Sequence, residues 1–484
     1  MKDDHEVTKF WNFAKTFDKA TLKENEVFAL GQGVYFLGEV DFGSRLFVRE
    51  CYLELLDLVL SGGKNVLLRG TPGIGKTHFS FLLILRLISE GKTVVYQRRS
   101  GLDSLLFSPT EVKSATTFRV FREVVRDPAT FLILDAVDTD LLPARTILVS
   151  SPQVSNFHDF EKNVDKKRDC YYMPPWSLDE ILVCNEQIYR RVVGSLREGF
   201  SQAGGVPRVL LKFDTIDKAK ILDAINEISG LKWSDIGRKL SLTSGTSGVR
   251  DTVSGKVFHM IPTPDLRDFV YGFASKYVAD EVFDRISENS ESDLCRLIKE
   301  SRELGEAGSL RGIWFERVAH IRMERGGDFA VRSLDGKSTL TKLVVPKKSP
   351  KKSFTDLSEV ADFSVGDYIV PKASNLESVD SMMKPDRLFQ MTVSPSHPCK
   401  QAGLHKAIVA ISSGAQGSPT KKQKGSGSKA IPASPPTCLY FVVPDDQYKG
   451  FQAQKYTDAK GRELVNVTYT DVDAIQQFAL EIKL

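Results

Sequence analysis

The sequence predicts an α/β fold in which a parallel sheet carries a phosphate-binding loop, and three observations lead to this prediction. The segment 70–77 has the pattern G-x-x-x-x-G-K-T, with a short apolar run before it and a helix-like pattern after it. Short apolar runs suited to buried strands alternate with helix-like stretches along the following residues. A further apolar run, 131–134, ends at Asp135. Together these features indicate a parallel sheet of the α/β class.

The composition of the 484-residue chain is that of a globular protein, with 41% apolar and 26% charged residues. The length suggests roughly two to four domains. A net charge of +4 is too small to indicate nucleic acid by itself, so any basic signal must be local. The six cysteines are scattered without a C-x-x-C pair, which predicts neither a zinc site nor a disulfide framework and favours a reduced compartment.

The beginning of the chain has no feature of a secretory signal peptide. Residues 1–6 are charged, and no apolar stretch follows them. The longest apolar run near a motif, 79–88, is too short and too interrupted to span a bilayer. The sequence therefore predicts no membrane association and shows no route out of the cell.

The elements around the loop are expected in a simple order. Residues 1–50 form an N-terminal segment, whose Phe36, Phe42 and Phe47 belong either to a small subdomain or to strands that flank the sheet. The following elements are predicted as a helix at 51–60, a strand at 66–68, a helix at 76–89, and strands at 93–97, 131–134 and 146–149.

The loop itself has the residue types that phosphate binding requires. Gly70, Gly73 and Gly75 allow a tight turn in which backbone N–H groups converge on phosphate oxygens. The positive end of the following helix adds to this attraction. Lys76 offers a charge to the β- and γ-phosphates, and the hydroxyl of Thr77 is a ligand suited to Mg²⁺. The residues expected to bind the nucleotide are Gly70, Thr71, Pro72, Gly73, Ile74, Gly75, Lys76, Thr77, His78 and Arg208.

An acidic residue near the loop is also needed to hold the magnesium shell, and Asp135 is predicted to be that residue, at the end of a neighbouring strand. ATPases of the AAA and STAND types usually have a glutamate next, where this chain has Ala136. Either Asp138 takes that role or the site has no catalytic base. The polar residues Ser150, Ser151 and Gln153 either sense the γ-phosphate or form an ordinary turn after the strand. Arg208 is either a second sensor of the phosphate or a surface arginine.

The middle of the chain is predicted to be mainly helical. Ser177 and Glu180 have the spacing of a capping box, so a helix is expected to start there. The glycines of 204–208 interrupt the helical pattern, which then dominates residues 215–310. Within it, 264–286 has the apolar periodicity of a single helix that faces the core.

After residue 310 the sequence becomes rich in β-type patterns. A Ser/Gly/Pro/Lys-rich stretch at 412–436 predicts a disordered insertion, and a strand is expected to follow at 438–443. Lysine clusters at 347–352 and 421–424 are either nuclear-import signals or solvated charged faces.

A second group of polar residues falls in this C-terminal part. Glu316 in a helix, Asp380 at the end of a strand, and Gln390 and Thr392 on a following strand have the order of a restriction-endonuclease-like site. In that site the first two hold a divalent metal, and residues at i and i+2 share one face of the strand. The usual glutamate and lysine are replaced here by Gln390 and Thr392, and Lys400 is an alternative source of the ammonium group. In the alternative interpretation, Glu316 and Asp380 are surface acids that have no relation to one another.

Six segments together resemble the Crinkler effectors and their relatives, the retrotransposon hot spot proteins. These segments are VLLRGTPGIGKT at 66–77, LILD at 132–135, PPWSLDEI at 174–181, GGVPR at 204–208, RGIWFE at 311–316 and FQMTVSPSHP at 389–398. The resemblance implies a STAND/AAA-like P-loop NTPase followed by an α/β restriction-endonuclease-like domain. The expected division is 1–50, an N-terminal segment; 51–215, the NTPase core; 216–305, a helical region; and 306–484, the nuclease-like domain.

The same resemblance implies an effector that reaches a host nucleus, damages DNA and causes cell death. Its cofactors would be ATP or another NTP with Mg²⁺, with Mn²⁺ as an alternative at the nuclease site, and its partners DNA and host nuclear proteins. The predicted catalytic residues are Lys76, Asp135, Glu316, Asp380 and Gln390, and the predicted metal ligands are Thr77, Asp135, Glu316 and Asp380. Two other functions stay open: a nucleotide switch with a degenerate nuclease domain, and a chromatin or transcription protein.

Overall fold

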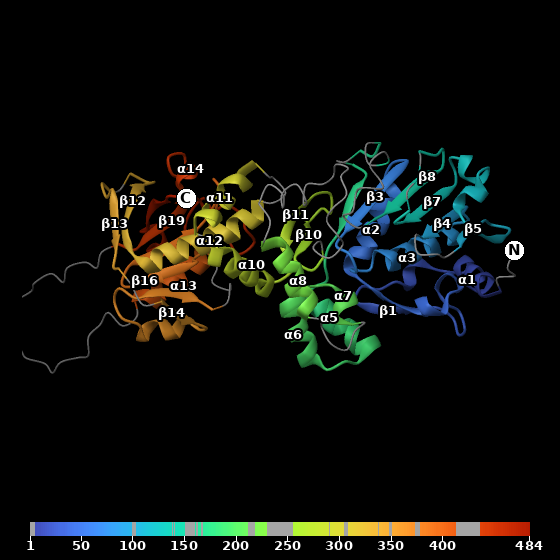
Figure 1. Cartoon of the computed structure of the whole chain (residues 1–484), viewed down its shortest axis with the longest axis horizontal. Helices are drawn as coiled ribbons and strands as arrows, with labels where there is room; N and C mark the ends of the chain where they lie inside the picture. The colour runs from blue at the N-terminus through green and yellow to red at the C-terminus, as the bar shows by residue number, and fades with distance from the viewer. Residues whose placement is uncertain are drawn as a thin grey trace, which may run out of the picture. The chain divides into compact units, whose positions relative to one another are not determined.

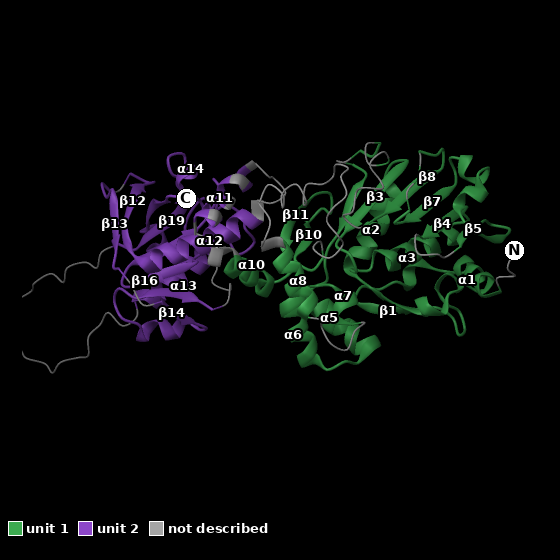
Figure 2. Cartoon of the chain, viewed as in Figure 1, with its two compact units in different colours: residues 1–289, 303–309 green, residues 290–302, 310–484 purple. Residues whose placement is uncertain are grey.

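The computed structural model divides the chain into two compact units (Figures 1 and 2). The first contains residues 1–289 and 303–309, and the second contains residues 290–302 and 310–484. The structure describes the chain outside 1–4, 99–102, 138, 140, 151–159, 161–162, 166–167, 212–217, 230–254, 290, 304–307, 337, 348–350, 373–377 and 413–435.

The first unit contains a seven-stranded sheet in the order β6-β5-β4-β7-β8-β3-β9. All neighbouring pairs from β4 to β9 are parallel, as predicted, while β5 and β6 form an antiparallel edge. Figure 1 shows β3, β8, β7, β4 and β5 in this spatial order. The strands are β3 (Asn65–Gly70), β4 (Val94–Arg98), β5 (Ser104–Phe107), β6 (Val112–Ala115), β7 (Phe131–Asp135), β8 (Arg145–Val149) and β9 (Cys170–Met173).

The helix predicted at 76–89 is α3 (Lys76–Ser89), which is buried along most of its length. The N-terminal segment packs onto it through aromatic rings: Phe36 stacks on Phe81 at 5.2 Å between ring centroids, and Phe42 lies 5.0 Å from the same ring. These residues therefore share one hydrophobic core with the sheet and do not form a subdomain of their own. The segment contains α1 (His5–Lys15), β1 (Glu26–Ala29) and β2 (Arg45–Val48), and α2 (Glu50–Ser61) follows it.

The capping box predicted at Ser177 and Glu180 is present, and α5 (Leu178–Cys184) begins at the next residue. The glycines of 204–208 lead into α7 (Pro207–Leu210), which has proline in its first turn, where no N–H is needed. The other helices of this part are α6 (Val193–Ala203), α8 (Lys218–Ser229) and α10 (Lys276–Asn289).

The stretch 264–286 is not a single helix, so that prediction is wrong. Its first part is β11 (Phe269–Phe273), which pairs antiparallel with β10 (Phe258–Pro262). Leu266, in the turn between them, has a φ of +57°, which a helix does not allow. The helix starts only at α10, where the N–H of Val278 donates to Ser275 Oγ. In the sequence, the apolar residues of β11 and of α10 follow one another with spacings that resemble the periodicity of a single helix.

The hairpin buries His259, and this burial predicts acid sensitivity of the fold. Burial lowers the pKa of His259 from 6.5 to about 4, although a hydrogen bond between Nε2 and the Gly255 carbonyl at 3.2 Å opposes this. Below pH 6.5 the unfolded chain binds the proton more readily, so stability falls with pH until about pH 4. The expected loss between pH 7.5 and pH 5 is about 2 kcal/mol.

Chemical denaturation at these two pH values measures this loss. The variant His259→Gln keeps an N–H donor without a titrating group, and it should lose less stability on acidification than the wild type. An identical loss in both proteins would contradict the assignment.

The second unit contains an eight-stranded sheet in the order β13-β12-β21-β19-β17-β16-β15-β14. Rings of Phe389, Tyr440 and Phe478 stack across its middle strands, with centroids 5.5 and 5.1 Å apart. The strands are β12 (Gly327–Ser333), β13 (Lys342–Val345), β14 (Lys351–Phe354), β15 (Tyr368–Pro371), β16 (Ser381–Met383), β17 (Arg387–Met391), β19 (Cys438–Pro444) and β21 (Gln476–Ile482).

The helices of this unit include α12, which places Glu316 in its middle, and α13, which connects β17 to the parallel strand β19. Most of the predicted insertion at 412–436 and the whole lysine cluster at 421–424 lie outside the described residues, as does part of the cluster at 347–352. The remaining elements are α11 (Glu291–Glu300), α12 (Gly308–Arg325), α13 (Gln401–Ser412), α14 (Asp445–Tyr448), α15 (Thr470–Asp473), β18 (Cys399–Lys400) and β20 (Tyr456–Thr457).

The two units do not follow the predicted four segments. Residues before 51 share a core with the sheet, the region 216–305 includes the β10–β11 hairpin, and the second unit begins at residue 290. The sequence could not show this because cores are formed by contacts between distant segments.

Candidate functional site

The predicted phosphate-binding loop joins β3 to α3 and has the strained backbone that its glycines permit. Gly73 and Gly75 have φ angles of +85° and +104°, which side chains with a Cβ rarely adopt. A Cβ on Gly75 would lie 2.4 Å from the hydroxyl oxygen of Tyr52, and this hydroxyl donates to the Gly75 carbonyl at 2.9 Å. The loop is therefore built around these glycines and is held from beneath by α2.

Lys76 lies inside the loop. Its Nζ donates to the carbonyl oxygens of Gly70 at 2.7 Å and Thr71 at 2.9 Å. Burial lowers the pKa of Lys76 to about 7, and the nearby Asp135 carboxylate only partly offsets this effect. A buried ammonium that donates to carbonyl oxygens favours the arrival of an anion.

Asp135 ends β7, and its Oδ2 accepts a hydrogen bond from Thr77 Oγ1 at 2.7 Å. Contrary to the prediction, its strand is not next to β3, because β8 lies between them. Burial raises the pKa of Asp135, while the Thr77 hydroxyl and the cations Arg98, Lys76 and Arg208 lower it. Adjacent hydroxyl and carboxylate oxygens fit the oxygen preference of Mg²⁺.

The residue after Asp135 is Ala136, which has no carboxylate side chain. Ala136 has a φ of +56°, and its N–H donates to the Val149 carbonyl at 2.8 Å. The alternative base Asp138 lies outside the described residues, as do Ser151 and Gln153. Ser150 is buried directly after β8, and its N–H donates to the Leu68 carbonyl at 2.9 Å.

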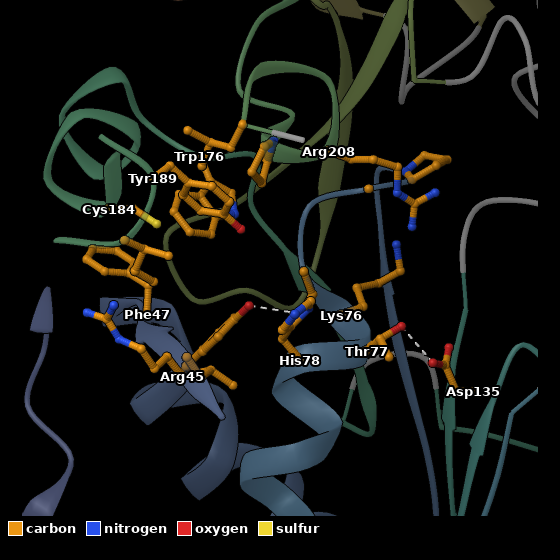
Figure 3. A pocket seen from close by; sticks show the side chains of 18 of the residues that line it. Arg45, Phe47, Lys76, Thr77, His78, Asp135, Trp176, Cys184, Tyr189 and Arg208 are labelled. Carbon is orange, nitrogen blue, oxygen red and sulfur yellow. Dashed lines mark hydrogen bonds between the residues drawn. The ribbon is translucent and has the colours of Figure 1, made fainter. Parts of the chain in front are cut away.

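The loop opens into a cavity of about 530 Å³ (Figure 3). In Figure 3, Lys76, Thr77, Asp135 and Arg208 line one part of the cavity, and a second, less polar part is lined by Phe47, Trp176, Cys184 and Tyr189. Figure 3 shows Lys76 and Arg208 pointing toward one another. The cavity is also lined by the apolar residues Leu46, Ile188 and Leu211.

The other predicted nucleotide-binding residues have varied positions. Pro72 and His78 line the cavity, and burial, with the charges of Arg98 and Arg208, lowers the pKa of His78 to about 4. Thr71 is buried, and its hydroxyl accepts a hydrogen bond from the Met260 N–H at 3.0 Å. Ile74 is also buried, so these two contribute through their backbone or through the shape of the loop.

No role was predicted for Trp176, although it lies in the segment PPWSLDEI at 174–181, one of the six that resemble the Crinkler effectors. Its indole Nε1 donates to the Ile74 carbonyl at 2.7 Å, which fastens the middle of the loop. The guanidinium of Arg49 lies over the indole at 4.9 Å and forms an ion pair with Glu180 at 2.8 Å. The capping residue Glu180 therefore also positions the arginine that supports Trp176.

Arg98 was also missed. It is the last residue of β4, it lines the cavity, and its Nε lies 3.8 Å from Asp135 Oδ2. The signal was available, because the carboxyl ends of parallel strands meet at one edge of a sheet and commonly carry the site.

The second predicted site is partly assembled. Asp380 Oδ2 accepts hydrogen bonds from Gln390 Nε2 at 2.7 Å and from the Met391 N–H at 2.6 Å. Burial and, to a smaller extent, the negative charge of Glu316 on α12 raise the pKa of Asp380 to about 7, although the hydrogen bonds from Met391 and Gln390 oppose this. The two acids therefore lie near one another. The Oε1 of Gln390 is buried, and it has no hydrogen-bond partner within the described part of the chain.

Two details of this site differ from the prediction. Asp380 stands before β16 and not at the end of a strand, and Glu377 lies outside the described residues. Thr392 has no bond to Asp380 among the described contacts; its hydroxyl accepts from the Ser394 N–H at 3.0 Å and lies 3.4 Å from His397 Nδ1. Among the described residues, no three His, Cys, Asp or Glu side chains form a metal-binding group.

The alternative ammonium source, Lys400, is in β18. Its backbone N–H donates to Ser378 Oγ at 2.6 Å. This contact places the main chain of Lys400 beside the segment that leads to Asp380, which keeps the alternative open.

The sheet order, the loop and the Lys76–Thr77–Asp135 group define the first unit as an α/β domain with a P-loop-like fold. Two proteins of Phytophthora infestans, Crinkler effector proteins 16 and 15, are each 26% identical to the chain over 373 residues, or 74% of its length. The chain spans 59% of the length of these two relatives. This similarity supports the predicted resemblance to the Crinkler family.

Other comparisons add little. No family model matches the chain. A Walker-type ATPase of Pyrococcus abyssi, 15% identical, aligns with 49% of this chain and 96% of its own at a TM-score of 0.29, which is too low to bear on the fold. In the described part of the chain, no helix combines the length and apolar character needed to cross a membrane.

Proposed function

We propose that this chain is a Crinkler-like effector in which NTP binding and hydrolysis by the first unit control the action of the second unit on DNA. The observation that carries the proposal is the convergence of Lys76, Thr77 and Asp135 on one cavity beside the phosphate-binding loop. The resemblance to the effectors supports secretion, action in a host nucleus and cell death as the biological setting.

In the first unit, each residue has a definable task toward the nucleotide. The loop N–H groups would bind the β-phosphate, and Lys76 would exchange its carbonyl partners for β- and γ-phosphate oxygens. Thr77 and Asp135 would hold Mg²⁺, which supplies positive charge to the same oxygens. The less polar part of the cavity would exclude water from the rest of the nucleotide. ATP is the proposed ligand, with other NTPs as outcomes of a binding comparison.

In the second unit, the order α12, β15, β16, β17, α13, β19 supports a nuclease-like domain. Glu316 comes from the helix, Asp380 precedes β16, and Gln390 lies on β17 beside Asp380. The unpartnered Oε1 of Gln390 and the raised pKa of Asp380 fit a site that accepts a divalent cation, either Mg²⁺ or Mn²⁺. Such an ion would polarise a phosphodiester of DNA.

Plasmid nicking with Mn²⁺ or Mg²⁺, with and without ATP, tests this proposal. Asp380→Asn keeps the shape of the side chain but removes its charge, and we expect it to reduce nicking by about 100-fold or more. Asp362→Asn changes an exposed acid elsewhere in the same unit and should nick like the wild type. Equal nicking by both variants would exclude Asp380 from the reaction.

A second function is favoured by Gln390, Thr392 and Ala136, each of which stands where a catalytic group is usual. In this alternative the chain is a nucleotide switch whose second unit binds nucleic acid or a host nuclear protein without cutting. DNA binding that responds to ATP, together with intact plasmid after long incubation, would favour it. A role on chromatin, as the hot spot relatives suggest, would show as association with nuclear DNA without strand breaks.

A further inference from the structure

Arg98 lines the cavity beside Asp135, at the carboxyl edge of the parallel sheet. It ends β4 and is in register with Asp135 on the adjacent parallel strand β7. Registered residues of parallel neighbours point to the same face, so both side chains leave the sheet at the edge next to the phosphate-binding loop. Both line the cavity together with Lys76.

The guanidinium of Arg98 is held in place by two contacts. Its Nε lies 3.8 Å from Asp135 Oδ2, which is longer than a hydrogen bond and leaves room for a closer acceptor. Its other support is the ring of Phe42, 5.2 Å away, and Phe42 in turn packs on Phe81 of α3. The side chain is 28% exposed, and it lines the cavity. An arginine held in this way loses little freedom when it binds an anion.

The chemistry of the site calls for such a cation. In hydrolysis, the oxygen of a water molecule bonds to the γ-phosphorus while the bond from this phosphorus to the bridging oxygen breaks. The bonding electrons stay on the leaving diphosphate, and the water proton passes to a phosphate oxygen. The negative charge that develops on the γ-phosphoryl oxygens and on the leaving diphosphate is stabilised by nearby cations.

We propose that Arg98 contacts the γ-phosphoryl oxygens and acts as an arginine finger supplied by the chain itself. This inference rests on the proposed NTP hydrolysis. Arg208 comes from a different element, α7. Its backbone N–H donates to the carbonyl of Gly73 in the phosphate-binding loop at 3.4 Å. Arg98 lies instead beside Asp135, at the end of the site where magnesium and the γ-phosphate belong.

The test separates binding from transition-state stabilisation. Affinities for Mg·ADP and for Mg·ADP with aluminium fluoride, which mimics the transferred phosphoryl group, are measured by calorimetry beside steady-state kcat. For Arg98→Gln we expect ADP affinity within about threefold of wild type, but kcat and aluminium-fluoride complex affinity lower by about 100-fold or more. Arg98→Lys should fall between, and added guanidinium ion should restore part of the activity of Arg98→Gln.

Matched controls make each outcome decisive. Arg126→Gln, in which an exposed arginine of the same unit is replaced, should behave as the wild type. Retained ADP binding shows that Arg98→Gln is folded. If the wild type hydrolyses ATP and Arg98→Gln keeps its kcat, the inference about Arg98 fails while the proposed function stands. If the wild type binds nucleotide but never hydrolyses it, hydrolysis fails and the inference about Arg98 fails with it.

Discussion

Replacing Lys76 with alanine is expected to weaken nucleotide binding by at least about 100-fold, the loss that follows from removing a charged partner of buried phosphates. The ammonium of Lys76 is buried, and its hydrogen-bond acceptors among the described residues are the carbonyls of Gly70 and Thr71. Without it, the loop keeps its backbone N–H groups but loses the charge that lies among them. Calorimetry with ATP and with ADP measures the change.

The control for this variant is Lys92→Ala, which removes an exposed lysine after α3 and should leave the affinity unchanged. The alanine variant at position 76 should keep its thermal unfolding transition, because it also removes the cost of burying a charge. A folded Lys76→Ala protein with wild-type affinity would refute the assignment of the site.

Replacing Gly205 with alanine is expected to destabilise the first unit by about 2 to 4 kcal/mol. A Cβ at this position would lie 1.9 Å from the backbone oxygen of Trp176 and 2.8 Å from its nitrogen. These are main-chain atoms, and the Trp176 N–H already donates to the Gly205 carbonyl at 2.9 Å. The segment must therefore move, which would also pull the indole away from Ile74 and loosen the phosphate-binding loop.

Urea denaturation and nucleotide affinity together measure this effect. Gly194→Ala is a suitable control, because no neighbouring atom lies within 4 Å of a Cβ there and alanine favours the helix α6. This control should be as stable as the wild type or slightly more stable. A Gly205→Ala protein with unchanged stability would contradict this prediction, because the backbone at Trp176 would then make room for the Cβ without loss of free energy of unfolding.

The sequence predicted the parts of the site that are continuous in the chain. The phosphate-binding loop, the helix at 76–89 and the strand before Asp135 are each specified by short-range rules: glycines for a tight turn, apolar periodicity for a helix, and an apolar run for a buried strand. The same rules predicted the capping box at Ser177. They failed at 264–286, where a strand and a helix with similar apolar content follow one another.

The site residues that were missed come from segments brought together only by folding. Arg98 reaches Asp135 because β4 pairs with β7, and Trp176 reaches the loop because β9 pairs with β3. The support of Trp176 by Arg49 and Glu180 joins residues 131 positions apart. No spacing along the chain contains this information, because strand pairing is decided by packing among distant segments.

The sequence by itself thus predicted a glycine-rich loop of the phosphate-binding pattern, with a lysine, a hydroxyl and an acid as the residues of the candidate site. It also predicted that Gln390 lies in a strand that follows Asp380 in the chain. Only the tertiary structure decided that Arg98 and Arg208 share the cavity with Lys76, and that Gln390 binds Asp380. The physical reason is that local backbone preferences act over a few residues, whereas a buried charge acquires its partners from whichever segments the core brings next to it.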